Sequence, residues 1–184
     1  MRLLPLLAAA LLAACASVPD ASVAPLRRID AATTDLAALR AAVDLPLALR
    51  PKPDTVTLVI TLIGWTGRTT QTFPLEADPD ATQRAERELA PPPGRHITAY
   101  RLPAAALAAT EDFRRRAIAE RRAPGITFGV GAEACRAGPL GAAPLPFTPY
   151  LFTPETAGFV ALAHPADLRR LVRGDLLAVL PPCA

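Results

Sequence analysis

The chain has 184 residues, a formal net charge of +3 and a hydrophobic content of 51%. A chain of this length can bury the core of one ordinary domain without many covalent staples. The small net charge gives no general case for nucleic-acid binding, so we expect no nucleic-acid partner.

The N-terminal segment combines a basic start, an apolar run and small residues before a cysteine. Arg2 supplies the positive charge. Leu3 to Leu12 form an apolar run of about ten residues, whereas crossing a hydrocarbon core takes ~20. The segment ends in Leu12-Ala13-Ala14-Cys15, and as a whole it resembles the signal peptide and lipobox of bacterial lipoproteins. The alternatives are an ordinary signal peptide and a buried N-terminal helix with a chance cysteine.

The resemblance implies cleavage before Cys15, a diacylglycerol thioether on that residue and an acylated new N-terminus. A mature lipoprotein carries two or three acyl chains, and at ~0.8 kcal/mol per buried CH₂ these hold it on the membrane. Ala16 stands where an inner-membrane retention signal would have Asp, which favours the outer membrane, facing the periplasm. We therefore expect a signal peptide over 1–14, a lipidated N-terminus and flexible tether over 15–28, and a single globular domain over 29–184.

The domain is predicted to begin with a helix over 34–43. Leu36, Leu39 and Val43 recur at helical spacing, and Pro46 ends the pattern. A short edge strand is expected at 47–49.

The clearest strand covers residues 55–63. One face carries Val56, Leu58, Ile60 and Leu62, and the other carries Thr55, Thr57, Val59 and Thr61. This alternation predicts an antiparallel sheet with its apolar face on a core and a mostly hydroxyl-bearing opposite face. Residues 68–75 are expected to return as the second strand of a hairpin.

The other predicted elements follow in chain order. They are a short helix within 78–89, a strand over 96–102, a helix over 103–122, a strand over 126–135, a loop over 138–149, a hairpin of 150–153 with 158–163, a short helix over 167–172 and a terminal strand over 176–180. Hairpins prevail over strand–helix alternation. The predicted fold class is therefore α+β or mainly β: an antiparallel sheet or sandwich built from hairpins, with two or three packed helices.

Lipidation of Cys15 would leave Cys135 and Cys183 as an even pair. Because the periplasm is oxidising, we expect a disulfide between them. Closing a loop of about fifty residues is worth roughly 4 kcal/mol in the chain-entropy relation. The alternative is two separate buried thiols.

Few residues are suited to catalysis. The only serines, Ser17 and Ser22, lie in the expected tether, which disfavours a serine hydrolase. His96 and His164 lack close ligand spacing, so we expect no metal site, and we expect no cofactor. Gly129 and Gly131 match the spacing of a dinucleotide-binding fingerprint. That motif needs a helix directly after it, and Gly138-Pro139 would end such a helix, so we do not expect dinucleotide binding. Glycines in a strand instead indicate a bulge or close packing.

Two surface features leave the function open. The basic run comprises Arg114, Arg115, Arg116, Arg121 and Arg122. It could bind an anionic partner such as lipid headgroups or an acidic protein face, or it could be a solvated helix face favoured by the helix dipole. The candidate acid/base carboxylates are Glu111, Asp112, Glu133, Glu155, Asp167 and Asp175. A non-enzymatic accessory or binding module, with an envelope protein or the cell wall as partner, is the leading hypothesis. A glycan hydrolase using two of these carboxylates is the alternative.

Overall fold

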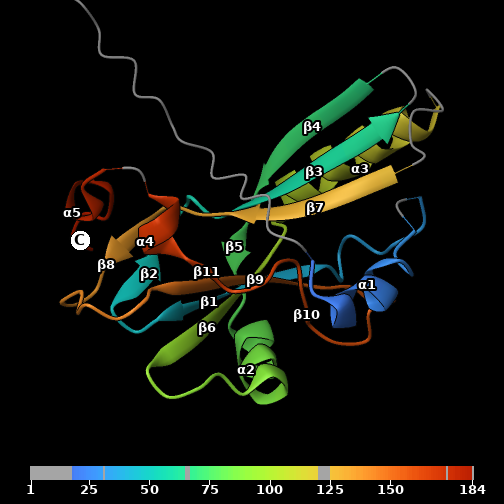
Figure 1. Ribbon diagram of the computed structural model, residues 1–184. Helices are drawn as coiled ribbons and strands as arrows, with labels where there is room; N and C mark the ends of the chain where they lie inside the picture. Colours follow the sequence, from blue (N-terminus) through green and yellow to red (C-terminus); the bar gives the residue numbers. More distant parts are fainter. Residues whose placement is uncertain (1–17, 31, 65–66, 120–124, 173, 184) are drawn as a thin grey trace, which may run out of the picture.

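Antiparallel strand pairing dominates the computed structural model, which describes residues 18–30, 32–64, 67–119, 125–172 and 174–183 (Figure 1). The helices are α1 (Asp20–Leu26), α2 (Pro79–Leu89), α3 (Ala104–Ala119), α4 (Leu168–Leu171) and α5 (Leu176–Val179). Several antiparallel sheets combined with helices confirm the predicted fold class. Among the helices of the described ranges, none is long and apolar enough to cross a membrane.

The main sheet is built around its central strand β1. Its strands run in the order β10-β9-β1-β6-β5, and β11 also pairs with β9. Their bounds are β1 (Arg40–Pro46), β5 (Glu76–Ala77), β6 (Arg95–Arg101), β9 (Pro146–Phe152), β10 (Val160–Ala161) and β11 (Ala166–Asp167). The β9–β10 pairing confirms the second predicted hairpin.

No helix forms over the predicted segment 34–43, so that prediction is wrong: residues 34–39 are turn and loop, and strand β1 begins at Arg40. Ala41, Val43 and Leu45 enter the larger core, whereas Ala42 on the opposite face packs in a second core. Because both faces of β1 are covered, its sequence lacks the alternation of a half-exposed strand. The helical spacing arose because Leu36 and Leu39, in the turn and loop before β1, are buried together with Val43 of the strand.

A second sheet has the order β4-β3-β7 and forms an arm beside the main sheet (Figure 1). Its strands are β3 (Thr57–Gly64), β4 (Gly67–Pro74) and β7 (Gly125–Gly131). The β3–β4 pairing confirms the predicted hairpin. Leu58, Ile60 and Leu62 are buried, and α3 covers their face through Phe113, whose ring centroid lies 5.9 Å from that of Phe73.

Helix α2 covers the other face of the main sheet. Asp78 starts this helix by accepting a hydrogen bond from the Ala81 amide, and Pro79 follows at the first helical position. The Arg40 guanidinium donates to the same carboxylate at 2.7 Å. Burial opposes ionisation of Asp78, but these hydrogen bonds outweigh it and lower its pKa. Ala81 and Ala85 bring α2 close to the sheet.

Three further predicted segments are corrected. Part of the expected tether forms helix α1, in which Ser22 is buried. The expected terminal strand is the short helix α5, because the Asp175 carboxylate accepts from the Leu177 amide and caps it. The expected loop over 138–149 ends early, because β9 begins at Pro146. A two-stranded sheet completes the structure: β2 (Leu49–Pro51) pairs with β8 (Ala134–Arg136).

A buried polar contact ties the loop before β1 to the turn after β9. The Oγ1 atoms of Thr34 and Thr153 and Oε2 of Glu155 are buried, and none of the three makes a hydrogen bond of ordinary geometry among the described residues. Partial burial acts to raise the pKa of Glu155, but the nearby hydroxyls of Thr34 and Thr153 favour the carboxylate and outweigh burial, so the pKa is lowered.

Glu155→Gln should destabilise the protein by about 1 kcal/mol at pH 7, because the amide is a weaker acceptor than the carboxylate. A lowered folded pKa contributes stability above the unfolded pKa, and this contribution is lost as the pH falls through the folded value. Melting temperatures of the two proteins should therefore begin to converge as the pH falls below the ordinary Glu pKa of about 4.3, and should meet below the folded value. Glu86→Gln, at an exposed site on α2, is the matched control. A Glu155→Gln deficit that persisted unchanged at low pH would contradict this account.

Candidate functional site

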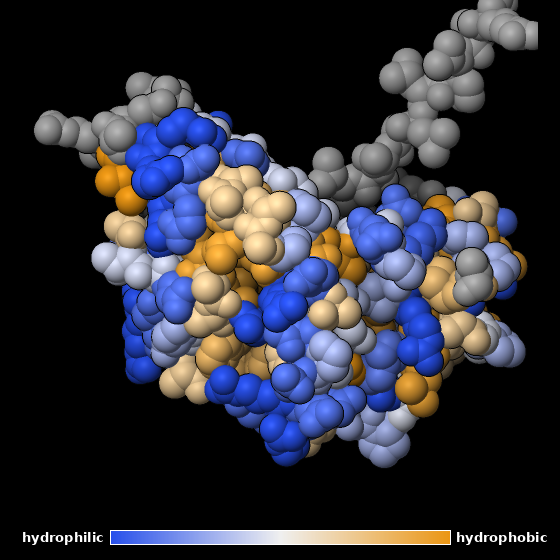
Figure 2. Space-filling view, turned by 180° about the vertical axis from the view of Figure 1, so that it is seen from behind, coloured by the Kyte–Doolittle hydropathy of each residue, from blue (hydrophilic) through white to orange (hydrophobic). Residues whose placement is uncertain are grey.

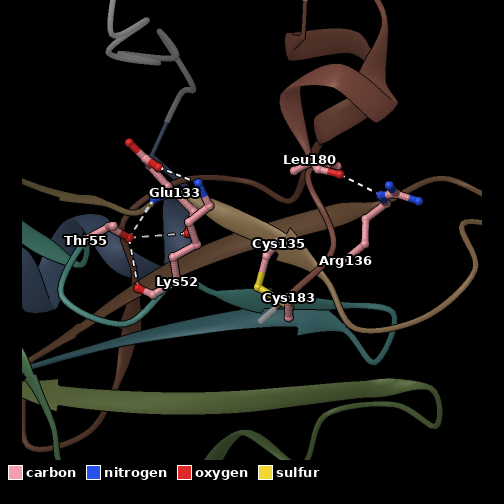
Figure 3. Close-up of a disulfide and its surroundings, with 7 residues drawn as sticks. All are labelled: Lys52, Thr55, Glu133, Cys135, Arg136, Leu180 and Cys183. Atoms are coloured by element: carbon pink, nitrogen blue, oxygen red, sulfur yellow. Dashed lines mark hydrogen bonds and ion pairs between the residues drawn. A yellow bond between two sulfur atoms is a disulfide. The ribbon is translucent and has the colours of Figure 1, made fainter.

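The predicted disulfide is present and fastens the C-terminal end to strand β8 (Figure 3). Cys135 lies on β8 and Cys183 follows α5, with their Cα atoms 4.9 Å apart and a separation of 48 positions in the sequence. Backbone bonds run alongside it: the Arg136 amide donates to Pro181 O at 2.8 Å, and the Cys183 amide donates to Arg136 O at 2.9 Å. The C-terminal tail is thereby held as a short parallel neighbour of β8.

A small cluster of polar contacts lies beside the disulfide (Figure 3). Lys52 pairs with Glu133 through its ammonium group at 2.8 Å, and its amide donates to the Glu133 carbonyl. The Thr55 hydroxyl donates to Lys52 O at 2.9 Å and accepts from the Glu133 amide at 3.1 Å. The only lysine of the chain therefore joins the segment before β3 to the segment after β7.

The predicted basic surface is only partly available to a partner. Arg114 is held by the Glu111 carboxylate, and it also donates to Thr34 O at 2.6 Å. Arg115 is paired with Asp112 one turn earlier on α3. Figure 2 shows hydrophilic side chains gathered toward the end of the arm, on its α3 side. Arg116, near the end of α3, is exposed, whereas Arg121 and Arg122 lie outside the described residues, as does Cys15.

The six carboxylates proposed for acid/base chemistry are spread over separate parts of the fold. Asp167 and Asp175 cap the short helices α4 and α5. Hydrogen bonding from the Leu145 amide lowers the pKa of Asp167. A glycoside hydrolase needs a general acid with a raised pKa beside a second carboxylate. Glu155 and Asp167 are shifted in the opposite direction.

The two histidines lie in different environments. His96 is half-buried on β6, and burial together with the nearby Arg50 guanidinium lowers its pKa, so it is neutral at pH 7. His164 is exposed in the segment between β10 and β11. Among the described residues, no group of three or more His, Cys, Asp or Glu side chains could hold a metal ion.

The main sheet holds a buried ion pair that sequence analysis missed. Arg95 Nε donates to Asp44 Oδ1 at 2.8 Å, with the two side chains 13% and 7% exposed. Both residues lie on the sheet face that α2 covers in part, with Tyr150 beside them. Burial is the main reason that the pKa of Tyr150 is raised. The two residues are 51 positions apart in the chain, so only strand pairing brings them together.

The three-stranded sheet has one covered face and one uncovered face, and the uncovered one carries its hydroxyl groups. Strand β3 presents Thr57, Val59 and Thr61 on the side opposite α3, and no described helix or strand lies over this side in Figure 1. In register beside them are Gly131, Gly129 and Thr127 of β7 and Pro74, Thr72 and Thr70 of β4. We call these nine residues the open face.

The two glycines of the open face differ in how much room a side chain would have at each position. A Cβ at Gly131 would lie 3.0 Å from the Thr57 hydroxyl, which is tight, so the expected close packing is present there. A Cβ at Gly129 would meet only Val59 at 3.7 Å, an ordinary contact. Internal packing therefore does not require glycine at 129. A glycine at position 129 leaves the strand backbone of β7 accessible from the open face.

Comparisons with protein-family models, curated protein sequences and solved structures gave no match. The lipobox resemblance and the geometry of the chain itself are therefore what bear on its function.

Cys183→Ser should lower the stability of the oxidised protein by roughly 4 kcal/mol, the chain-entropy value for a loop of this length. Thermal melting with and without reductant measures it. The reductant should destabilise the parent protein and leave the variant unchanged. Equal melting temperatures for the oxidised parent and the variant would contradict a stabilising role for the bridge.

Proposed function

We propose that this protein is a lipid-anchored, periplasm-facing binding module of the cell envelope, without catalytic activity. The lipobox resemblance at Leu12–Cys15 supports the anchor, and the Cys135–Cys183 disulfide suits an oxidising compartment. The observation that carries the binding role is the open face of the β4-β3-β7 sheet.

The chemistry of the open face suits adhesion to an extended polar partner. Threonine hydroxyls both donate and accept hydrogen bonds, and the glycines of β7 let a partner approach the backbone. The hydroxyls of Thr61 and Thr70 already lie 2.9 Å apart, so part of the surface is fixed in place before binding. Pre-ordered side chains lose less entropy when a partner binds. A cell-wall strand or an extended segment of an envelope protein matches these properties.

The alternative function, glycan hydrolysis through paired carboxylates, has less support. Glu111, Asp112 and Glu133 each form an ion pair with a neighbouring cation. The open face contains no carboxylate. A hydrolase would therefore need another surface.

Cys15→Ser should move the protein from the membrane fraction to the soluble periplasmic fraction, because the acyl chains supply the attachment. Fractionation followed by immunoblotting measures this change, and mass spectrometry of the N-terminal peptide checks the acylation. Ala16→Ser is the matched control and should stay on the membrane. Retention of the Cys15→Ser variant on the membrane would contradict the anchor.

A photo-reactive amino acid at Thr61, on the open face, should yield a cross-linked adduct in living cells. The same group at Gln83, exposed on α2, is the control and should not yield that adduct. Mass spectrometry of the adduct separates a protein partner from cell-wall fragments. Adducts from the Gln83 position alone would place the binding surface elsewhere.

A further inference from the structure

Strand β4 is an unprotected edge of the three-stranded sheet. It pairs with β3 over its whole length, from Gly67 to Pro74, without a bulge. No strand of the described chain pairs with its other side, and Figure 1 shows it at the outer border of the arm. Edge strands are usually protected by lysine, by internal proline or by bulges. In β4, the only proline is the last residue and the only charged residue is Arg68.

The hydrogen-bond phase of the hairpin determines which backbone groups point outward. The Leu75 amide donates to Val56 O at 2.9 Å, which marks this position as a hydrogen-bonded pair. Pairs alternate along an antiparallel ladder. The pair of Leu58 with Phe73, and every second pair along the hairpin from it, therefore exchange backbone hydrogen bonds between β3 and β4. The N–H and C=O groups of Arg68, Thr70 and Thr72 consequently point toward the open edge.

We propose that β4 pairs antiparallel with β4 of a second copy of this chain, about a two-fold axis through Thr70. Thr70 then faces Thr70 of the second copy, and Arg68 faces Thr72 of the second copy. Two hydrogen bonds for each of three opposed pairs give about six backbone bonds across the junction. The interface is isologous, so it closes at two copies.

The sequence of β4 is compatible with its own antiparallel copy. No like charges face each other, because the two Arg68 residues stand four positions apart, about 13 Å at strand spacing, beyond the ~8 Å Debye length. Thr69 falls opposite Gln71 of the second copy, and Gly67 opposite Phe73. Every directly opposed pair is therefore polar and uncharged, singly charged, or glycine against an aromatic ring.

The paired sheets would place the two open faces side by side on one surface, because a two-fold axis perpendicular to the sheet keeps each face on its own side. This pairing does not depend on the binding role proposed above. It can be tested on the full chain carrying Cys15→Ser, without lipid or partner.

The first test compares Thr70→Lys with Thr127→Lys by size-exclusion chromatography with light scattering over a range of protein concentrations. Thr127 is exposed on β7, at the opposite edge of the same sheet. The parent and Thr127→Lys should have twice the mass of one chain. Thr70→Lys opposes two cations at the axis and should weaken association about tenfold or more. Circular dichroism melting should show all three proteins folded.

The second test uses the lipidated protein in its own membranes. Thr70→Cys should give a covalent dimer with a short bismaleimide, because opposed Cα atoms in a hydrogen-bonded pair lie about 5.5 Å apart. Thr127→Cys should not. A parent protein that stays monomeric, a Thr70→Lys variant that dimerises as the parent does, or cross-linking only from Thr127→Cys would overturn the proposal.

Discussion

The alternation of side chains along β3 is the constraint on which the rest of this structure depends. Burial of Leu58, Ile60 and Leu62 under α3 leaves Thr57, Val59 and Thr61 no orientation except outward. A slip of one residue would exchange the two sets and expose the apolar one, so the register is strongly fixed. The same constraint determines which backbone groups of β4 point toward its open edge. Core packing therefore positions both surfaces assigned to binding.

Charged groups contribute mainly to holding elements together. Arg95 with Asp44 and Arg40 with Asp78 join the strands and helix of the main sheet. Lys52 with Glu133 joins the two segments that lead into and out of the arm. The nine residues of the open face carry no charge; they offer threonine hydroxyls and glycine backbone, with Val59 and Pro74 as the other two side chains. Such a surface suits binding better than proton transfer, which needs a titratable group with a shifted pKa.

The C-terminal end depends on covalent attachment. Helix α5 is a single turn with Leu177 and Val179 exposed, so it buries little apolar surface of its own. The bridge at Cys183, the backbone bonds to Arg136 and the Arg136 side chain on Leu180 O hold it against β8. A lipid at Cys15 and a disulfide at Cys183 would then constrain the mature chain near both ends.

Sequence by itself determined the features that depend on local pattern. The hydroxyl and apolar faces of β3, the β3–β4 hairpin and the start of α3 after Pro103 follow from spacing or composition. The pairing of Cys135 with Cys183 followed from the lipobox resemblance, which assigns Cys15 to lipid and leaves two cysteines. The lipobox is also local, and it remains a prediction from sequence.

Only the tertiary structure decided the features that depend on what covers a segment. The spacing of Leu36 and Leu39 predicts one face of a helix, but both are buried in the turn and loop before β1, whose own two faces are both covered. The segment predicted as a terminal strand is the short helix α5, with Asp175 as its cap. The ion pair of Asp44 with Arg95 and the open edge of β4 arise from the order in which strands assemble. Pairing between distant segments leaves no periodic signal in a single sequence, because each strand's pattern records which face is buried and not which strand lies beside it.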